Sequence, residues 1–370
     1  MFGKSARLLA GVCIAGFVSA GCSEKSEVAA TPNMSTDASL PPVDPTSEPM
    51  ELAAMPDADM NDVLVKLAGL GGKPIETLSP TDARKQPTPA DAVKALMDEK
   101  GLAPSSAVAT SDVTYPAGEG TQEARIYTPV GANGSLPVVL YIHGGGWVIA
   151  DIDVYDSAPR ALAEAAQAVV VSIEYRHAPE AKFPAAHDDA NKAYDWIVAN
   201  ASKWGGDPKR IAIVGESAGG NMAINVAMAA RDKGWRVPKA VVAVYPVANT
   251  SPDLEAKQTY ADAKPLNKPM LDWFFKHTLT SPDQAADPRL NLVAANLKNL
   301  PPTTIILAEI DPLHDDGVTL AAKLGEAGVA VEIKEYAGVT HEFFGMGSVV
   351  ADAKAAVAFA ADKLKTALGS

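Results

Sequence analysis

Cysteine is almost absent from this chain of 370 residues, which contains only Cys13 and Cys22. Two cysteines cannot build the disulfide framework of a small secreted domain. Aromatic residues make up only 6% of the chain, which disfavours a surface that stacks bases. Basic residues are also outnumbered, and the formal charge of −13 argues against nucleic acid and against an anionic lipid surface as partners. The remaining composition, 47% hydrophobic and 21% charged, is that of an ordinary globular protein.

An apolar run close to the N-terminus, residues 8–20, is the first positive signal in the chain. Lys4 and Arg7 precede it and small residues follow it. A basic start, a short apolar core and small residues before the cut are typical of a secretory signal peptide, and the run is too short to span a bilayer comfortably. We therefore predict a signal peptide of the lipoprotein type over residues 1–21.

Cys22 follows a glycine directly after this run. That arrangement resembles the bacterial lipobox, in which the cysteine becomes the lipidated first residue. Cleavage after Ala20, leaving Cys22 as a free thiol, is the alternative. Residues 22–59 are rich in Pro, Ser, Thr, Ala and acidic residues without a hydrophobic period, which predicts a disordered tether. The expected location is the bacterial periplasm or cell envelope, with membrane contact only through a lipid at Cys22.

Regular hydrophobic spacing begins at about residue 60. Residues 61–69 and 89–100 have helical spacing, and residues 74–87 between them look irregular. We expect residues 60–110 to contribute helices to a cap.

Short Val- and Ile-rich runs alternate with amphipathic stretches over residues 111–370. The expected strands are 112–116, 122–128, 138–142, 169–175, 211–214, 240–245, 305–308 and 331–336. Apolar strands separated by helices predict an α/β fold with a mostly parallel sheet covered on both faces. Residues 249–299 break this alternation because they contain no strand, which favours an insertion that completes the cap.

Residues 215–219 read Gly-Glu-Ser-Ala-Gly and lie between a strand-like run and a helical one. In the Gly-x-Ser-x-Gly motif the serine occupies a sharp strand-to-helix turn that exposes its hydroxyl. Ser217 is therefore the candidate nucleophile. A surface loop that contains the pattern by chance is the alternative.

Residues 143–147 read His-Gly-Gly-Gly-Trp and directly follow the expected strand 138–142. Consecutive glycines let backbone N–H groups point at one place, as a developing oxyanion requires. A flexible loop or a phosphate loop is the alternative, but a phosphate loop would continue with Lys and Ser or Thr, whereas Trp147 stands here. We expect His143 to brace this loop.

The base and the acid should follow Ser217 in the order Ser, Asp, His that accompanies the motif. Of the six histidines, His341 is the one on the loop after the last expected strand. Four carboxylates follow the strand 305–308: Glu309, Asp311, Asp315 and Asp316. Asp311 is preferred because Pro312 would fix a short turn at the strand end. Asp315 or Asp316 is expected to cap the next helix.

With these residues in place, the chain resembles the bacterial hormone-sensitive lipase family of α/β-hydrolases from about residue 112 onward. The matching segments, in family order, are 143–147 (HGGGW), 175–180 (YRHAPE), 215–220 (GESAGG), 311–313 (DPL) and 341–343 (HEF). The resemblance implies an α/β-hydrolase fold, with a mostly parallel central sheet, helices on both faces and a helical cap that includes an insertion over about residues 249–299.

The resemblance also assigns roles within the site. The implied catalytic triad is Ser217, Asp311 and His341, and the implied oxyanion donors are the N–H groups of Gly145, Gly146 and Ala218, with Gly144 adjoining. Three positions depart from the family pattern. Glu216 stands where Asp is frequent, His177 replaces the usual Leu, and Glu342 replaces the more frequent Gly. The second change touches packing under the glycine loop, and the third the mouth of the site.

The expected function is that of a serine carboxylesterase that hydrolyses short to medium acyl esters, small molecules, through an acyl-enzyme. Amidase, peptidase or lactonase activity on the same triad is an alternative, and so is a non-catalytic ligand-binding role. The mechanism needs no cofactor and no metal, and the sequence shows no clustered set of metal ligands.

Overall fold

Eight strands form one sheet in the order β1-β2-β4-β3-β5-β6-β7-β8 in the computed structural model, which describes residues 54–369. The strands are β1 (Val108–Ala117), β2 (Gly120–Pro129), β3 (Leu136–Ile142), β4 (Val169–Ile173), β5 (Gly206–Glu216), β6 (Val241–Val244), β7 (Thr303–Ile310) and β8 (Val331–Thr340). β2 pairs antiparallel with β1 and with β4, and every pair from β4 to β8 is parallel. The predicted α/β-hydrolase fold class is confirmed.

Some N-terminal predictions cannot be compared with the structure. The predicted signal peptide over residues 1–21, the predicted lipidation of Cys22 and the predicted tether up to residue 53 lie outside the described residues. Of the helices within residues 54–369, none combines the length and the apolar character that crossing a bilayer requires.

Two strands extend beyond their apolar cores. β5 begins at Gly206, because Gly206 pairs with Leu136 although the residues after it are polar. β8 continues to Thr340, which pairs with Ile310. Both strands are thus longer than their hydrophobic patterns indicate, because backbone pairing continues beyond the apolar residues. As a result, Ser217 and His341 each directly follow a strand end.

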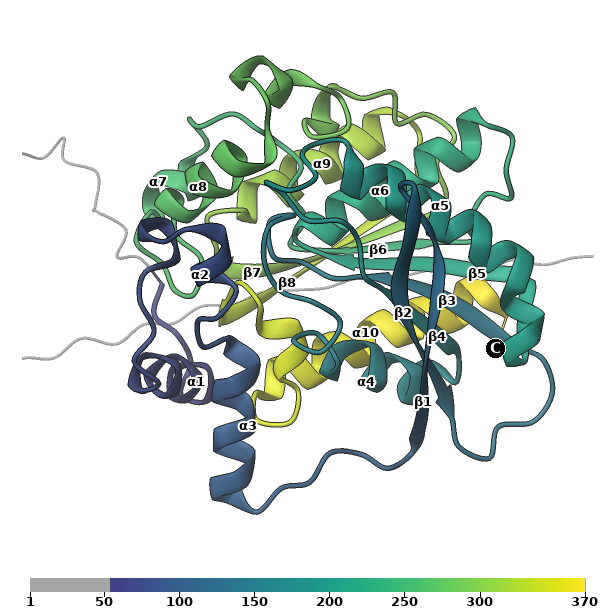
Figure 1. Ribbon diagram of the computed structural model, residues 1–370, viewed down its shortest axis with the longest axis horizontal. Helices are drawn as coiled ribbons and strands as arrows, with labels where there is room; N and C mark the ends of the chain where they lie inside the picture. The colour runs from purple at the N-terminus through teal and green to yellow at the C-terminus, as the bar shows by residue number, and fades with distance from the viewer. Residues whose placement is uncertain (1–53, 370) are drawn as a thin grey trace, which may run out of the picture. The chain divides into compact units, whose positions relative to one another are not determined.

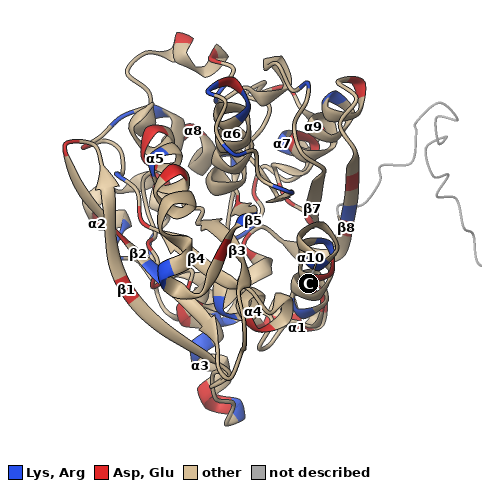
Figure 2. Ribbon diagram, turned by 90° about the vertical axis from the view of Figure 1, so that its right-hand side faces the viewer, with Lys and Arg blue, Asp and Glu red and all other residues tan. Residues whose placement is uncertain are grey.

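Helices cover both faces of the sheet (Figure 1). α4 (Ser157–Ala166) and α10 (Ala351–Leu368) pack on one face, and α5 (Ala185–Asn200), α6 (Ala218–Asp232) and α9 (His314–Glu326) pack on the other. The side chains of the central strands alternate between the two cores they form, as strand geometry requires. Lys and Arg are interspersed with Asp and Glu over the outer helices (Figure 2).

Two segments far apart in sequence form the cap. The first contains α1 (Ala58–Gly69), η1 (Ile75–Thr77), α2 (Pro80–Ala83) and α3 (Pro89–Lys100), and the second contains α7 (Glu255–Thr259), α8 (Lys268–Thr278), η3 (Pro282–Ala286) and η4 (Leu292–Ala294). Asn267 donates a hydrogen bond to Glu76, and the Trp273 indole donates one to Leu78 O at 3.1 Å. The segment around η1 is therefore bound to α8, and α2 lies near α8 in Figure 1.

Residues 74–87, expected to be irregular, contain two short helices, η1 and α2. Helices of three and four residues are too short to show a hydrophobic period. The local signal was Ser79, whose hydroxyl caps α2 by accepting from the Asp82 N–H. Two further short 3₁₀ helices, η2 (Ala201–Trp204) and η5 (Phe343–Met346), follow α5 and the loop that carries His341.

The start of α1 is joined to the end of β8. The Asp57 N–H donates to Gly338 O at 2.8 Å, and the Asp57 carboxyl group occupies the space that a Cβ on Gly338 would need. The Thr340 hydroxyl donates to Met60 Sδ at 3.6 Å. The N-terminal cap segment is thus fixed to the strand that precedes His341.

Candidate active site

Ser217 lies on a strained turn between β5 and α6. Its φ of 56° and ψ of −117° are unfavourable for a residue with a side chain. A Cβ on Gly215 would overlap the carbonyl oxygen of Gly219, and a Cβ on Gly219 would overlap that of Ile142. Both flanking residues must therefore be glycine for the turn to form against β3, which explains the spacing of the motif.

Three side chains from the ends of β5, β7 and β8 meet in one hydrogen-bonded line. His341 Nε2 lies 3.0 Å from Ser217 Oγ, and His341 Nδ1 lies 2.6 Å from Asp311 Oδ2. Ser217 is 5% exposed, His341 2% and Asp311 0%. The other oxygen of Asp311 accepts the Leu313 N–H at 2.8 Å, which fixes the carboxylate in the turn after β7. The structure thus brings the three predicted triad residues together.

The charges around His341 favour its protonated form. Burial alone would lower the pKa of His341, but the hydrogen-bonded Asp311 carboxylate outweighs it, and the pKa lies above its ordinary value. The carboxylates of Glu342 and Glu216 add to this increase. Glu342 Oε1 lies 4.0 Å from His341 Nε2, on the side of Ser217.

The prediction that Asp315 or Asp316 caps α9 is wrong. Leu313 occupies the N-cap position without a side-chain hydrogen bond. Asp315 instead accepts the Ala256 N–H in the cap insertion at 2.9 Å, and buried Asp316 lies 3.0 Å from Lys257 Nζ. Both carboxylates therefore bind the insertion, a tertiary contact that overrides the local capping pattern.

The glycine loop approaches Ser217 closely. A Cβ on Gly144 would lie 3.2 Å from Ser217 Cβ, and Gly145 and Gly146 have φ values of 91° and 58° that favour glycine. Within residues 54–369, no acceptor takes a hydrogen bond from the N–H groups of Gly145, Gly146 or Ala218. These three N–H groups, in the glycine loop and directly after Ser217, are thus not occupied by an acceptor from this part of the chain.

Side chains hold the glycine loop from beneath. His143 Nδ1 lies 2.9 Å from Gly144 O, and its ring stacks on Tyr175 at 4.4 Å. The Tyr175 hydroxyl donates to His143 O and to Gly144 O, at 3.1 and 2.7 Å. His143 therefore braces the loop as expected.

The two glutamates that flank the triad residues form a network with tyrosines. Buried Glu216 accepts hydrogen bonds from the hydroxyls of Tyr141 and Tyr245. Burial, together with the charge of Glu342, raises the pKa of Glu216 to about 7. Glu342 accepts from the Tyr155 hydroxyl at 2.6 Å and has a φ of 71°, a conformation that favours the glycine it replaces.

A cavity of about 970 Å³ opens above Ser217 and His341. The glycine loop lines it together with both cap segments, which contribute apolar side chains such as Ile75, Met270 and Phe274. A largely apolar pocket of this size with a few polar groups is typical of a small-molecule site.

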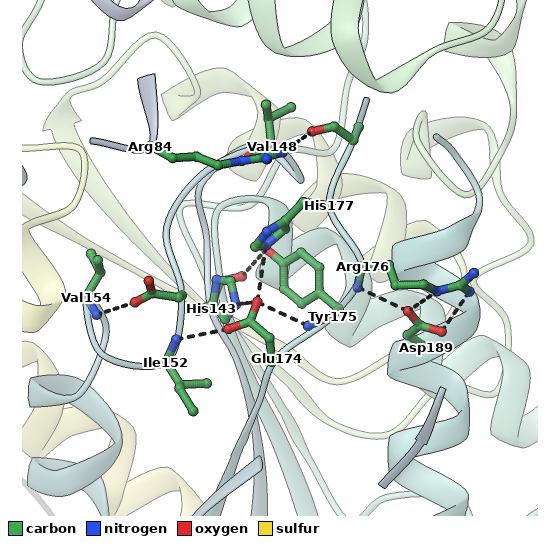
Figure 3. A network of polar contacts seen from close by, with 12 residues as sticks. Arg84, His143, Val148, Ile152, Val154, Glu174, Tyr175, Arg176, His177 and Asp189 are labelled. Carbon is green, nitrogen blue, oxygen red and sulfur yellow. Dashed lines mark hydrogen bonds and ion pairs between the residues drawn. The ribbon is translucent and has the colours of Figure 1, made fainter. Parts of the chain in front are cut away.

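The sequence shows no clustered set of metal ligands, but the fold brings three candidate ligands together. Among the described residues, His143, Glu174 and His177 place one nitrogen or carboxylate oxygen each within 4.8 Å of one another (Figure 3). The sequence hides this group because 31 positions separate the first two residues. β3 and β4 are neighbours, however, so the residues that follow them meet. Burial lowers the pKa of His177 to about 4, so its ring is neutral at neutral pH.

Known proteins with similar sequences and structures are hydrolases. A family model described as alpha/beta hydrolase fold matches residues 139–345. Ethyl acetate hydrolase of Pseudomonas putida is 35% identical over 297 residues, which are 78% of this chain and 92% of that protein. Carboxylesterase NlhH of Mycobacterium tuberculosis is 39% identical over 248 residues, 66% of this chain and 78% of that protein.

Solved structures agree with these relatives. A hyperthermophilic esterase from Pyrobaculum calidifontis superimposes with a TM-score of 0.76 at 32% identity, covering 85% of this chain and 98% of its own. The ester hydrolase EH1AB1 from the metagenome of Lake Arreo, complexed with a bipyridine phosphonate derivative, gives a TM-score of 0.77 at 32% identity, with 85% of this chain and 100% of its own covered.

Proposed function

The chain belongs to the alpha/beta hydrolase family, in its hormone-sensitive lipase-like branch, and is a carboxylic ester hydrolase; from that premise we propose that Ser217 is its nucleophile. The observation that carries the proposal is the hydrogen-bonded line from Ser217 through His341 to Asp311, in which Ser217 and His341 line the cavity.

In the proposed reaction, His341 Nε2 accepts the proton of Ser217 Oγ while the oxygen bonds to the ester carbonyl carbon. Asp311 keeps the other ring proton on Nδ1 and stabilises the imidazolium. The N–H groups of Gly145, Gly146 and Ala218 are the proposed donors to the oxyanion, and Gly144 leaves room for their approach. The ester C–O bond then breaks, and the leaving alcohol takes the proton from His341. Water repeats the cycle and releases the acid.

We further propose that the preferred acyl chains are short to medium. The cap closes over a cavity of limited volume, and one relative carries the name ethyl acetate hydrolase. A series of p-nitrophenyl esters from acetate to palmitate tests this point. We expect kcat/KM to fall steeply beyond medium chains, and a maximum at palmitate would contradict the proposal. The matching anilides in the same series measure amidase activity.

The nucleophile is tested by Ser217→Ala. We expect turnover of p-nitrophenyl butyrate to fall at least about ten-thousand-fold, since triad members act as a unit. A fluorophosphonate should label the unmodified protein at Ser217 and leave the variant unlabelled. Ser111→Ala, at an exposed position of β1, is the matched control and should keep full activity. Near-normal turnover by Ser217→Ala would contradict the assignment.

We also propose that the protein is exported to the bacterial cell envelope and lipidated at Cys22, on the basis of the apolar run and the position of the cysteine. Mass spectrometry of the mature N-terminal peptide tests this. A diacylated Cys22 is expected in the cell membrane fraction, and Cys22→Ser should move the activity to the soluble periplasmic fraction. An unmodified Cys22 in mature protein would contradict lipidation.

A further inference from the structure

We propose that His143, Glu174 and His177 form a binding site for a divalent transition-metal ion, with Zn²⁺ as the preferred occupant, beneath the glycine loop (Figure 3). The site is separate from the proposed esterase chemistry, which needs no metal. Two imidazoles and one carboxylate are a donor set that Zn²⁺ uses in proteins.

The spacing of the donor atoms matches a tetrahedral ion. Glu174 Oε1 lies 3.4 Å from His143 Nε2 and 3.3 Å from His177 Nε2. Zinc bonds to nitrogen and oxygen are about 2.0–2.1 Å long, and a tetrahedron with such bonds separates neighbouring ligands by about 3.3 Å. Two of the three separations therefore already have the length that coordination requires.

The hydrogen bond at the far side of His143 sets its tautomer. Gly144 O can only accept, so Nδ1, 2.9 Å away, carries a proton and Nε2 is the nitrogen left to face Glu174. Nε2 lies 3.4 Å from the carboxylate oxygen of Glu174, to which the protonated ring donates. A metal ion between the two atoms would take the place of that Nε2 proton. Histidines that bind metals commonly donate their other N–H to a backbone carbonyl in this way.

His177 supplies a second nitrogen. Its Nε2 is buried and forms no hydrogen bond with any residue that the structure describes, although it points at the same oxygen of Glu174. A buried polar atom without a partner is costly, and an ion at this position would remove the cost. The family that the sequence resembles usually has Leu at this position, and a Leu side chain has no atom that can bind a metal ion. The third ligand therefore distinguishes this chain from that pattern.

The carboxylate and the surrounding backbone are fixed in advance. Glu174 Oε2 accepts the Ile152 N–H at 3.3 Å, and Tyr175 stacks on His143 and packs edge-on against His177. Glu174 directly follows β4, and His143 directly follows β3. Ligands at the ends of paired strands hold their spacing without an ion. Glu174 and His177 also line the cavity, which gives an ion and a water ligand access.

Metal binding would act on the glycine loop. An ion on Nε2 would fix the ring of His143, which contacts Gly144 through its other nitrogen. The expected consequence is a higher melting temperature and a more rigid loop, because a ligand that binds only the folded state stabilises it.

The full chain, treated with chelator and with Cys13 and Cys22 alkylated, provides the test. Isothermal titration with Zn²⁺ should show one saturable site, and Co²⁺ should give the intense visible absorption of tetrahedral coordination. His177→Leu should weaken Zn²⁺ binding at least about a hundredfold, consistent with the loss of one ligand and its support. Glu174→Gln, which keeps the side-chain shape, should also weaken it. His277→Leu, the same substitution on helix α8, is the control and should bind normally.

The absence of saturable Zn²⁺ binding in the unmodified sequence would overturn the proposal, and so would equal affinity in His177→Leu. Melting temperatures of the metal-free variants identify a folding defect. Zn²⁺ should raise the melting temperature of the unmodified sequence but not that of His177→Leu or Glu174→Gln. Ser217→Ala should keep Zn²⁺ binding, which separates failure of this site from failure of the proposed nucleophile.

Discussion

Two glycine-bearing turns face each other across the reacting position, and different atoms hold them. In the turn around Ser217, the neighbours of Gly215 and Gly219 are backbone carbonyl groups. In the glycine loop, Gly145 also meets a backbone carbonyl, that of Ile149, but the nearest neighbours of Gly144 and Gly146 are side chains, the hydroxyl of Tyr155 and the ring of Phe274. The proposed nucleophile is therefore held by backbone atoms alone, whereas the glycine loop is held in part by side chains that can rotate.

A side chain of the cap also helps to hold the glycine loop. Arg84, which ends α2, donates to Val148 O and to Ala178 O, both at 2.8 Å, and pairs with Glu180 (Figure 3 labels Arg84 next to Val148). One cap side chain thus joins the end of the glycine loop to the segment after Tyr175. The position of the proposed nucleophile is set by the sheet, and the position of the proposed oxyanion donors depends on the cap as well.

The largest effect is expected from Gly219→Ala, which tests the backbone-held turn. The new Cβ would overlap Ile142 O, and no rotation of a side chain relieves the clash. We expect a loss of about 3 kcal/mol or more in the free energy of unfolding, measured by chemical denaturation. Gly69→Ala, where a Cβ meets nothing within 4 Å, is the control. Unfolding free energies within experimental error of each other would contradict the comparison.

Gly146→Ala probes the side-chain-held loop. The new methyl group would overlap the Phe274 ring at a φ of 58°. We expect kcat/KM to fall about tenfold to a hundredfold as an oxyanion donor is displaced. Adding Phe274→Ala should recover part of this loss, since residues in contact are not additive. Strictly additive losses in the double variant would show that the ring does not restrain the loop.

Arg84→Ala tests whether the contact between the cap and the glycine loop affects kcat in addition to the free energy of unfolding. Removing hydrogen bonds from a charged donor should cost about 1–3 kcal/mol of unfolding free energy, and kcat should fall because the loop loses its anchor. Arg231→Ala is a matched control, because Arg231 also donates to two carbonyl groups, Asn296 O and Lys298 O, far along the chain from the loop. The control should lose stability with unchanged kcat. Equal kcat in both variants would contradict the role of Arg84.

Glu342→Gln should give the smallest effect, a shift in pH dependence. The Glu342 carboxylate helps to raise the pKa of His341, so its neutral counterpart should lower that pKa. His341 then stays unprotonated, and able to act as a base, at lower pH, and the acid limb of the kcat/KM profile moves to lower pH. Glu335→Gln, at an exposed carboxylate of β8 paired with His314, is the control. A shift to higher pH would contradict the argument.

Much of the fold could be predicted because β4 and β6 are buried along their whole length, β3 is buried after Leu136, and all three appear as largely apolar runs. The positions of Ser217, Asp311 and His341 could be predicted because each directly follows a strand and chain order restricts the choice. The contacts of Asp315 and Asp316 could not, because their partners lie in an insertion without a hydrophobic period. The grouping of His177 with Glu174 and His143 depends on strand neighbours that the sequence does not specify.

The junction between α1 and β8 has a mechanical consequence. Asp57 is bound to Gly338, which lies three residues before His341 on the same strand and loop. Tension applied through the chain that precedes Asp57 would act first on this strand and only afterwards on the helices of the cap. The strand that carries His341, rather than the cap, is therefore the element closest to a force applied from the N-terminal side.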